Sequence, residues 1–286
     1  METAQQKGFF SFTDNGVLTN MRNTDVRKGE GCPVESYMEL AEKVARIQFM
    51  NHCDAVMFRG QNQDFRNRMK NTSIKPSLLR PDSKGINPTP EIINNRFSSL
   101  KLAEEMLVRA YTKNKFLGKD RFIRTRILRW AILQHYEVCI TPLLDVTHSL
   151  RIAVAFATLE NSSDKAYLYV LDVPNLSGAI TTSVEQGIQC IRLSSICPSE
   201  AMRPHIQEGY LLSDYPESEF ENVDRMLEFG SYEIDFGVRL IGKFYFHPVD
   251  FFCKSPNFPQ VAREALYPNG YDPLYDITQD LKREIL

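Results

Sequence analysis

The sequence lacks cysteine pairs at metal-binding or redox spacing, and it lacks long apolar runs. None of its six cysteines forms a C-x-x-C pair, which argues against a structural zinc site and a disulfide framework. Cys53, Cys139 and Cys253 lie in apolar runs, as buried free thiols do. No apolar run approaches membrane-spanning length and residues 1–8 are polar, so we expect no membrane segment and no signal peptide. We therefore predict a cytoplasmic protein without a bound metal.

An excess of either charge is also missing. The chain has 34 Lys and Arg against 36 Asp and Glu, for a formal net charge of −2. Such a balance argues against a protein that holds nucleic acid by bulk electrostatics, but a local basic patch can still serve that purpose. The arginines between residues 121 and 129 form the best patch of this kind. We interpret them as the solvated face of a helix rather than as a phosphate-binding track.

What is present is the composition of an ordinary globular protein. The chain has 286 residues, of which 43% are hydrophobic, enough to bury a sizeable core. No internal repeat and no linker divides it. We predict one α+β domain over residues 35–286. Residues 1–34 are predicted to be a partly ordered N-terminal extension that forms a strand or hairpin at most.

Local patterns predict most of the secondary structure. Ser36-x-x-Glu39 is a capping box followed by apolar residues at helical spacing, which predicts an amphipathic helix. A short buried strand is expected over residues 54–58, ending at Arg59-Gly60, and residues 76–80 are expected to be extended. The other expected elements are helices over residues 91–116, 121–136, 148–159 and 277–286, and strands over residues 165–173, 206–212 and 238–246.

Polar residues stand at several points where packing alone does not require them. An arginine at the exit of a buried strand, such as Arg59, presents a guanidinium suited to a phosphate or carboxylate. Gly60 beside it lets a ligand approach the backbone. A structural ion pair explains Arg59 equally well. At the end of a predicted helix, His135 would have its imidazolium form favoured by the helix dipole, or it is a capping residue bonded to a carbonyl.

Two further segments carry candidate groups. Thr147 and Ser149 offer hydroxyls and free amides before an apolar helix, where an anion can bind, and Asp145 or Thr147 can cap that helix. Asp145, His148 and Ser149 have the residue types of a hydrolase triad, but no G-x-S-x-G elbow accompanies them and we reject that interpretation. Strand alternation would place Glu208 between Ile206 and Tyr210 on one face, either as an edge charge or as a poised carboxylate.

In order and spacing these segments resemble the FRG-domain family over residues 35–286. The most specific part is the Gln-His block with the Leu-Leu-Asp and Ala-Phe-Ala steps that follow it. Glu137 departs from a position that is often Gly in the family, and we place Glu208 where the family more often has Gln. The segments that carry the resemblance are Phe58-Arg59-Gly60, Gln134-His135-Tyr136, Leu143-Leu144-Asp145, Thr147 and Ser149, residues 153–157, residues 203–210 and residues 266–271.

The family's layout is similar to that of ADP-ribosyltransferases, which implies a split, bent β-sheet core with a helical insertion that grips NAD. The resemblance implies that Arg59 contacts the pyrophosphate or adjoining ribose and that the Gly60 backbone holds the nicotinamide amide. Thr147 and Ser149 would line the nicotinamide ribose. Glu208 would stabilise the oxocarbenium-like state as nicotinamide leaves, and His135 would orient Glu208 or a target nucleophile.

Three hypotheses follow from this resemblance. The first is an ADP-ribosyltransferase that uses NAD to modify a protein or a nucleic acid, as a toxin or antiviral-defence effector. A toxin inside the cell would need a neutralising antitoxin partner, of which the chain shows no sign. The second is an NAD glycohydrolase, in which water is the acceptor. The third is a non-catalytic module that binds a nucleotide or a partner.

Overall fold

The fold is α+β, as predicted. The computed structural model describes residues 8–52, 55–174, 177–215, 234–268 and 272–285. It forms two compact units, each assembled from three separate stretches of chain. The sheet unit comprises Met1–Ile74, Val146–Leu176 and Asp235–Ala265, and the helical unit comprises Lys75–Asp145, Ser177–Ile234 and Leu266–Leu286. Because the chain passes repeatedly from one unit to the other, no single linker separates them in the sequence.

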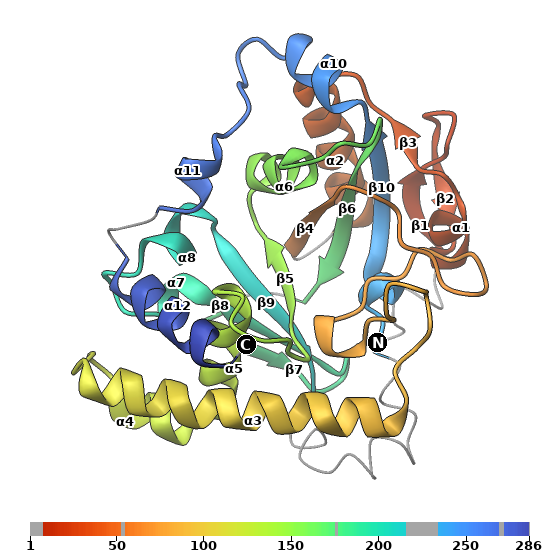
Figure 1. Cartoon of the computed structure of the whole chain (residues 1–286). Coiled ribbons are helices and arrows are strands. Elements are labelled where there is room, and N and C mark those ends of the chain that lie inside the picture. The colour runs from red at the N-terminus through yellow and green to blue at the C-terminus, as the bar shows by residue number, and fades with distance from the viewer. Residues whose placement is uncertain (1–7, 53–54, 175–176, 216–233, 269–271, 286) are drawn as a thin grey trace. The chain divides into compact units, whose positions relative to one another are not determined.

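The sheet unit is built on a sheet with the strand order β3-β10-β6-β4 (Figure 1). β10 is parallel to β3, whereas β10–β6 and β6–β4 are antiparallel. Residues 1–34 were expected to form a strand or hairpin at most; the hairpin β1–β2 is present, but the segment also contains α1 and β3, so that limit was wrong. The elements are β1 Phe9–Phe12, β2 Leu18–Met21, α1 Asn23–Lys28, β3 Cys32–Pro33, α2 Tyr37–Asn51, β4 Ala55–Gln61, α6 Leu150–Thr158, β6 Ala166–Val173, η4 Phe236–Arg239, β10 Leu240–Phe246 and α10 Pro248–Cys253.

The two faces of this sheet differ in chemistry. On one face, Gly60 of β4 lies against Ala153 of α6, and Gly242 of β10 lies against Ile47 of α2. Both glycines let a helix approach the strands closely. Because neighbouring residues of a strand point to opposite faces, Arg59 points away from α6, onto the other face. That second face is polar around Arg59.

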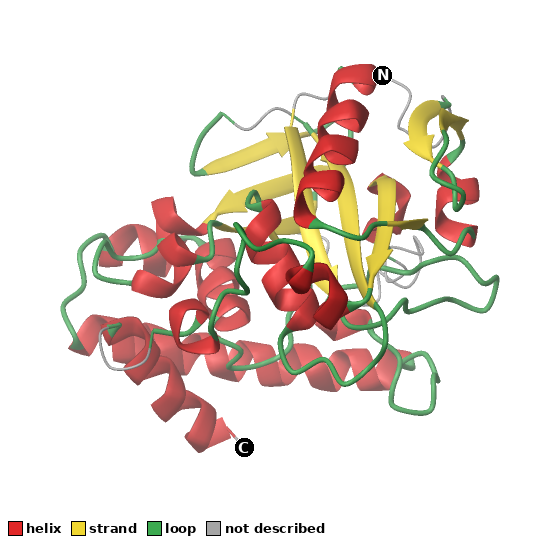
Figure 2. Cartoon of the chain, turned by 90° about the horizontal axis from the view of Figure 1, so that it is seen from above, coloured by secondary structure: helices red, strands yellow, loops and turns green. Residues whose placement is uncertain are grey.

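The helical unit has a core shared among α3, α5 and α12, with the antiparallel strands β9-β8-β7 beside it. The longest of its described helices, α3, runs for 24 residues and can be followed in Figures 1 and 2. β5 Leu144–Thr147 and α11 Arg263–Leu266 span the boundaries between the units in the sequence. The other elements are η1 Ser77–Leu79, α3 Pro90–Lys113, α4 Lys119–Arg124, α5 Arg126–His135, β7 Ile180–Ser183, β8 Ile188–Arg192, α7 Leu193–Ile196, α8 Met202–Ile206, β9 Gly209–Asp214 and α12 Pro273–Ile285.

The sequence-based expectations for individual elements were met only in part. Ser36 caps α2 as expected, since its side chain accepts from the Glu39 N–H, but the box is incomplete because the Glu39 carboxylate accepts from the Glu35 N–H rather than from the Ser36 N–H. The helix expected over residues 121–136 is broken at Thr125, whose extended backbone separates α4 from α5. The segment expected to be extended contains the 3₁₀ turn Ser77–Leu79. Cys253 was expected to be buried but is exposed, and Cys53 lies outside the described residues.

Candidate functional site

Arg59 lies inside a strand rather than at its exit. β4 continues through Gly60 to Gln61, and Arg59 is paired with Tyr169 of β6. Tyr169 is in turn paired with Lys243 of β10. Since cross-strand partners share a face, these three side chains form a row on the polar face of the sheet. Arg59 is half-buried. Burial raises the pKa of the Tyr169 hydroxyl well above its usual value, and the positive charge of Arg59 acts against this rise.

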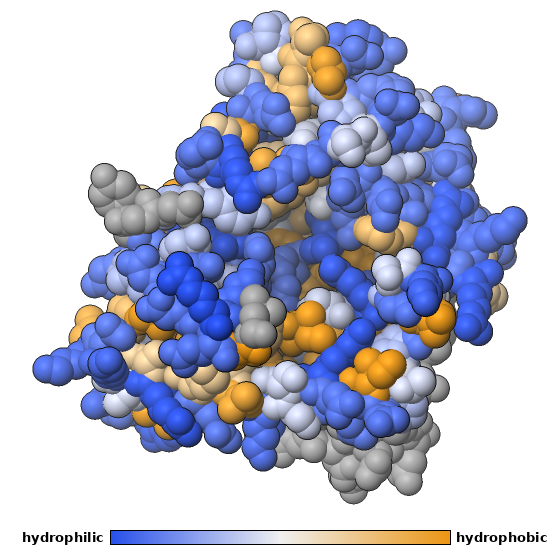
Figure 3. Space-filling view, in the orientation of Figure 1, coloured by the Kyte–Doolittle hydropathy of each residue, from blue (hydrophilic) through white to orange (hydrophobic). Residues whose placement is uncertain are grey.

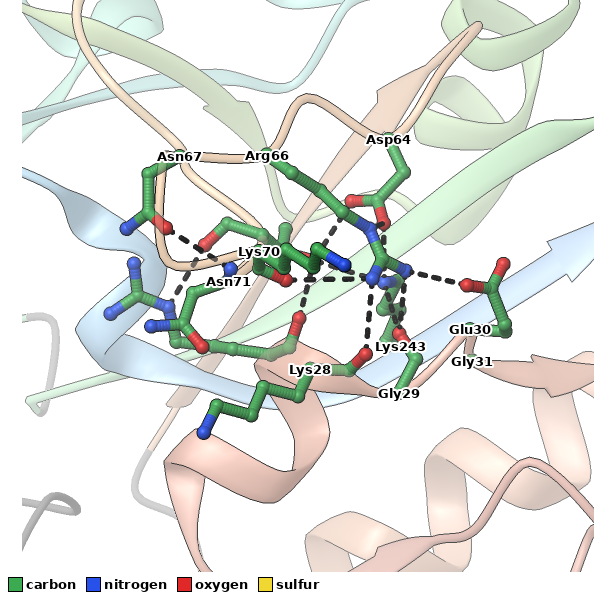
Figure 4. Close-up of polar contacts among 12 residues, drawn as sticks. Lys28, Gly29, Glu30, Gly31, Asp64, Arg66, Asn67, Lys70, Asn71 and Lys243 are labelled. Atoms are coloured by element: carbon green, nitrogen blue, oxygen red, sulfur yellow. Dashed lines mark hydrogen bonds and ion pairs between the residues drawn. The ribbon is translucent and has the colours of Figure 1, made fainter.

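Asp64 organises the polar face beside this row (Figure 4), and the sequence did not single it out. Its Oδ2 accepts from the Lys243 ammonium at 2.6 Å and from Arg66 Nε at 2.7 Å. Its Oδ1 accepts from the Thr72 hydroxyl at 2.8 Å and the Tyr169 hydroxyl at 3.0 Å. Burial lowers the pKa of Lys243, whereas the bond to Asp64 acts in the opposite direction. The Asp64 carboxylate therefore joins β6, β10 and the segment that follows β4 through hydrogen bonds to its negative charge.

Gly60 is explained by the packing of α6. A β-carbon at this position would overlap the carbonyl oxygen of Ala153 and lie 2.8 Å from the backbone nitrogen of Ala157. These are backbone atoms of a helix, so no side-chain rotation relieves the overlap. The Phe-Arg-Gly and Ala-Phe-Ala segments of the resemblance are thus two sides of one helix–strand contact. The role of the Gly60 backbone toward NAD stays a prediction.

Thr147 lies next to the Arg-Gly strand. It belongs to β5, which the sequence did not predict, and it pairs with Phe58 of β4. Thr147 therefore shares the face of Phe58, opposite to Arg59. Among the described residues, the register between β4 and β5 is this one pair, whereas β4 pairs with β6 along its whole length.

Neither Asp145 nor Thr147 caps α6. The helix begins after Ser149, which occupies the N-cap position without a capping bond from its side chain. The Thr147 hydroxyl instead accepts from the Ser149 N–H at 3.0 Å. Because β5 continues through Asp145 to Thr147, both residues have extended backbone and lie too early to cap the first turn. Ser149 itself is half-buried.

His135 ends α5 and is buried, with 3% of its surface exposed. Its Nδ1 lies 3.8 Å from Asp145, and Asp145 accepts from the Gln134 amide at 2.5 Å. Gln134 also accepts from the Thr141 hydroxyl at 2.5 Å. Burial lowers the pKa of His135, and the nearby Arg203 lowers it further, while Asp145 and Glu137 raise it. Burial therefore opposes the imidazolium form that the helix dipole was expected to favour.

We predict that His135 makes the protein less stable at mildly acidic pH. An unfolded histidine has a pKa of about 6.5, and the folded pKa lies below it. Below pH 6.5 the unfolded state therefore binds more protons, so the free energy of unfolding falls by up to about 1.4 kcal/mol per pH unit. Urea unfolding at pH 7.0 and 5.5 measures this fall.

The variant His135→Gln should show a smaller fall than the wild type over the same pH interval. His205→Gln is the matched control, because His205 is exposed in the same unit. An identical pH dependence in wild type and His135→Gln would contradict the assignment of His135 as a neutral buried group.

The later motif segments form a second polar cluster in the helical unit. Arg203 forms an ion pair with Glu137 at 2.7 Å, and its guanidinium lies over the rings of Tyr136 and Tyr267. The Tyr136 hydroxyl donates to Asp272 at 2.7 Å. A shallow depression is lined by Arg203, Tyr267, Pro268, Asp272 and Tyr275. It encloses no space large enough for a water molecule, so it does not accommodate a dinucleotide.

Glu208 does not lie on a strand. Helix α8 precedes it and β9 begins after it, so Glu208 occupies an exposed turn with a left-handed φ of 44°. The predicted strand face of Ile206, Glu208 and Tyr210 is therefore wrong. The buried residue of this turn is Gln207, whose amide donates to the Leu266 carbonyl at 2.9 Å. The resemblance includes an Arg-x-x-x-Gln-x-Gly pattern. Counted from Arg203, its glutamine position falls on Gln207 rather than on Glu208.

Gly209 completes the same turn. A β-carbon there would lie 2.8 Å from Leu193 and 3.3 Å from Cε1 of His135. The glycine thus leaves room for the buried imidazole. Of the predicted site residues, the structure groups Arg59, Gly60, Thr147 and Ser149 in the sheet unit, and His135 and Glu208 in the helical unit.

The arginines over residues 121–129 divide into two pairs. Arg126 and Arg129 lie 3.6 Å and 3.2 Å from the buried carboxylate of Glu104. Burial raises the pKa of Glu104, and both arginines act against that rise. Arg121 and Arg124 are exposed. Half of this arginine stretch therefore serves the packing of α5 on α3.

No helix within the described residues is both long enough and apolar enough to cross a membrane. No cluster of three or more His, Cys, Asp or Glu side chains among them is arranged to hold a metal ion.

Comparison with known proteins identifies one family. Residues 54–166 match the family model of the FRG domain, a stretch that runs from the start of β4 to the start of β6 and includes α6. No curated protein and no solved structure gives a significant match to the chain.

Proposed function

The chain belongs to the FRG-domain family, and from this we propose that it is an NAD-dependent ADP-ribosyltransferase that modifies a macromolecule in the cytoplasm. Arg59, Gly60, Thr147 and Ser149 would hold NAD. The acceptor would be a protein or a nucleic acid. The biological role we propose is that of a toxin or antiviral-defence effector, with an antitoxin as its neutralising partner.

The observation that carries this proposal is the pairing of β4 with β5 at the motif residues. The Arg-Gly and Thr-x-Ser segments are far apart in the sequence, yet the pair Phe58–Thr147 brings them together in the sheet unit. The proposal includes a split sheet of the ADP-ribosyltransferase type. Arg59, which is half-buried, would contact the ligand from one face of β4, and the buried Thr147 would lie on the opposite face.

In the proposed reaction the bond between nicotinamide and the ribose C1′ breaks, and a nucleophile of the acceptor bonds to that carbon. Nicotinamide leaves with the bonding electrons, and the nucleophile loses a proton. Arg59 would neutralise the pyrophosphate. Glu208, which is exposed, would stabilise the positive charge that develops on the ribose.

The roles of Arg59 and Glu208 are tested with labelled NAD and a cell lysate. Wild-type protein should transfer label to a macromolecule, and Arg59→Ala and Glu208→Ala should each lower the rate by about 100- to 1,000-fold. Arg68→Ala is the control, because Arg68 is an exposed arginine of the same unit as Arg59. Thermal unfolding of each variant shows whether the fold is intact.

Two results would sink the proposal: no label transfer by the wild type, or equal transfer by the wild type, Arg59→Ala and Glu208→Ala. Free ADP-ribose without a labelled macromolecule would instead identify an NAD glycohydrolase. NAD binding without either product would identify a binding module.

A further inference from the structure

The C-terminal end of α3 and the adjoining α4 carry a dense group of cations. Between residues 109 and 124 the chain has one carboxylate, Asp120, although its formal net charge as a whole is −2. All six cationic side chains of this segment are exposed. They are Arg109, Lys113, Lys115, Lys119, Arg121 and Arg124. We call residues 109–124 the basic tip.

The cations of the basic tip are scarcely neutralised by the protein itself. Arg109 lies 4.0 Å from Glu105, at the limit of an ion pair, and both side chains are exposed. Arg124 donates to the backbone carbonyl of Asp120 rather than to its carboxylate. Within the described part of the chain, Lys113, Lys115, Lys119 and Arg121 take part in none of the ion pairs. This differs from Arg126 and Arg129, whose charge is directed to the buried Glu104.

An aromatic cluster fixes the backbone of the basic tip. The ring of Tyr111 stacks on Phe122 at 4.1 Å and contacts Phe116 at 4.8 Å, which joins α3 to α4. The Tyr111 hydroxyl donates to the Leu117 carbonyl at 3.3 Å. Gly118 has a left-handed φ of 76° and allows α4 to begin at once. The cations are therefore presented on an ordered turn, which lowers the entropy lost when a partner binds.

The distribution of apolar residues indicates the kind of partner. An amphipathic surface that binds a membrane needs a broad apolar face beside its cations. Here the apolar side chains Tyr111 and Phe122 are buried in the core of the unit, and the large apolar residues left exposed are Leu117, at 86%, and Ile123, at 41%. Over α3 and α4, Figure 3 shows hydrophilic side chains interspersed with hydrophobic ones. Cations without an apolar face suit the phosphates of a nucleic acid.

We propose that the basic tip binds the phosphate backbone of a nucleic acid without reading its sequence. Long cationic side chains contact phosphates and carry no base-specific information. The near-neutral charge of the whole chain does not oppose this binding, because the six cations are concentrated on one short segment. Binding at the basic tip requires neither NAD nor the proposed ADP-ribosyl transfer.

Fluorescence anisotropy of a labelled single-stranded RNA and a labelled DNA duplex, without NAD, tests the proposal. Because up to six phosphates are contacted, affinity should fall by about 1,000-fold between 50 and 200 mM salt. The variant Lys113→Glu/Lys115→Glu/Arg121→Glu should bind about 100-fold more weakly or worse, and the slope of log affinity against log salt should become shallower.

The matched control is Lys84→Glu/Lys282→Glu/Arg283→Glu. It changes the net charge by the same amount within the same unit, with Lys84 before the start of α3 rather than at its end. This control should keep at least about half of the wild-type affinity, because its cations lie outside the basic tip. Circular dichroism checks that both triple variants are folded.

Equal loss of affinity in the two triple variants, or no nucleic-acid binding by the wild type, would overturn the proposal. So would binding to phosphatidylserine vesicles without binding to either nucleic acid. Nucleic-acid binding by a protein that transfers no ADP-ribose would leave this proposal standing and remove only the proposed enzymatic function.

Discussion

Gly60→Ala is expected to lower the free energy of unfolding by about 3 kcal/mol or more, enough to leave much of the protein unfolded or insoluble. Overpacking a core costs ~1–3 kcal/mol when side chains can adjust. Here the added methyl group would meet the Ala153 carbonyl and the Ala157 nitrogen, which are backbone atoms of α6. The helix would have to move away from β4 to make room. Chemical denaturation of the purified variant measures the loss.

Gly178→Ala is the control for this substitution. A β-carbon at Gly178 would meet no closer atom than the Ile180 carbonyl oxygen at 3.8 Å, so the free energy of unfolding should change by less than about 1 kcal/mol. If Gly60→Ala were as stable as the wild type but lost NAD binding, the packing explanation would be wrong. The glycine would then serve the approach of the ligand.

Lys243→Met is expected to cost about 3–5 kcal/mol, the usual effect of removing one partner of a buried ion pair. The Lys243 side chain is 1% exposed, and its ammonium donates to Asp64, to the Gly29 carbonyl and to the Thr72 hydroxyl. Methionine fills a similar volume but satisfies none of these acceptors. The remaining bond from Arg66 to Asp64 places the loss toward the lower end of this range. Urea unfolding at neutral pH measures it.

Two further variants test the interpretation of the Lys243 result. Lys254→Met removes a cation from an exposed pair with Glu35 in the same unit, where the lysine side chain is 53% exposed, and should leave stability unchanged within error. The double variant Lys243→Met/Asp64→Asn should be more stable than Lys243→Met alone, because it no longer buries the aspartate charge without its lysine. Additive losses in the double variant would show that the two groups are not coupled.

Packing and buried hydrogen bonds explain several of the motif residues that carry the family resemblance. Gly60 accommodates α6, Gly209 leaves space for His135, and Gln207 closes a turn onto Leu266. Gln134 and Asp145 bind one another rather than facing a ligand alone. Several of the motif residues therefore serve close packing and buried hydrogen bonds. Arg59 differs, since it is half-buried on the polar face of β4, directly after the buried residues Val56, Met57 and Phe58.

Elements with a strong local signal could be predicted from the sequence. The Ser36 cap marked the start of α2, and the alternation over residues 165–173 predicted β6. The composition and the order of motifs predicted the α+β class and the FRG family, because these depend on the pattern of residues along the chain.

Contacts between distant segments determined the features that local sequence patterns do not predict. β5 is too short to be distinguished from a turn by alternation, and it is a strand because Thr147 meets Phe58 of a distant segment. Glu208 lies in a turn rather than in the predicted strand, and Gln207 beside it donates a hydrogen bond to the carbonyl of the distant Leu266. The Asp64–Lys243 pair joins residues far apart in the chain, and burial lowers the pKa of His135. Each of these outcomes depends on burial and long-range contacts, which exist only once the chain has folded.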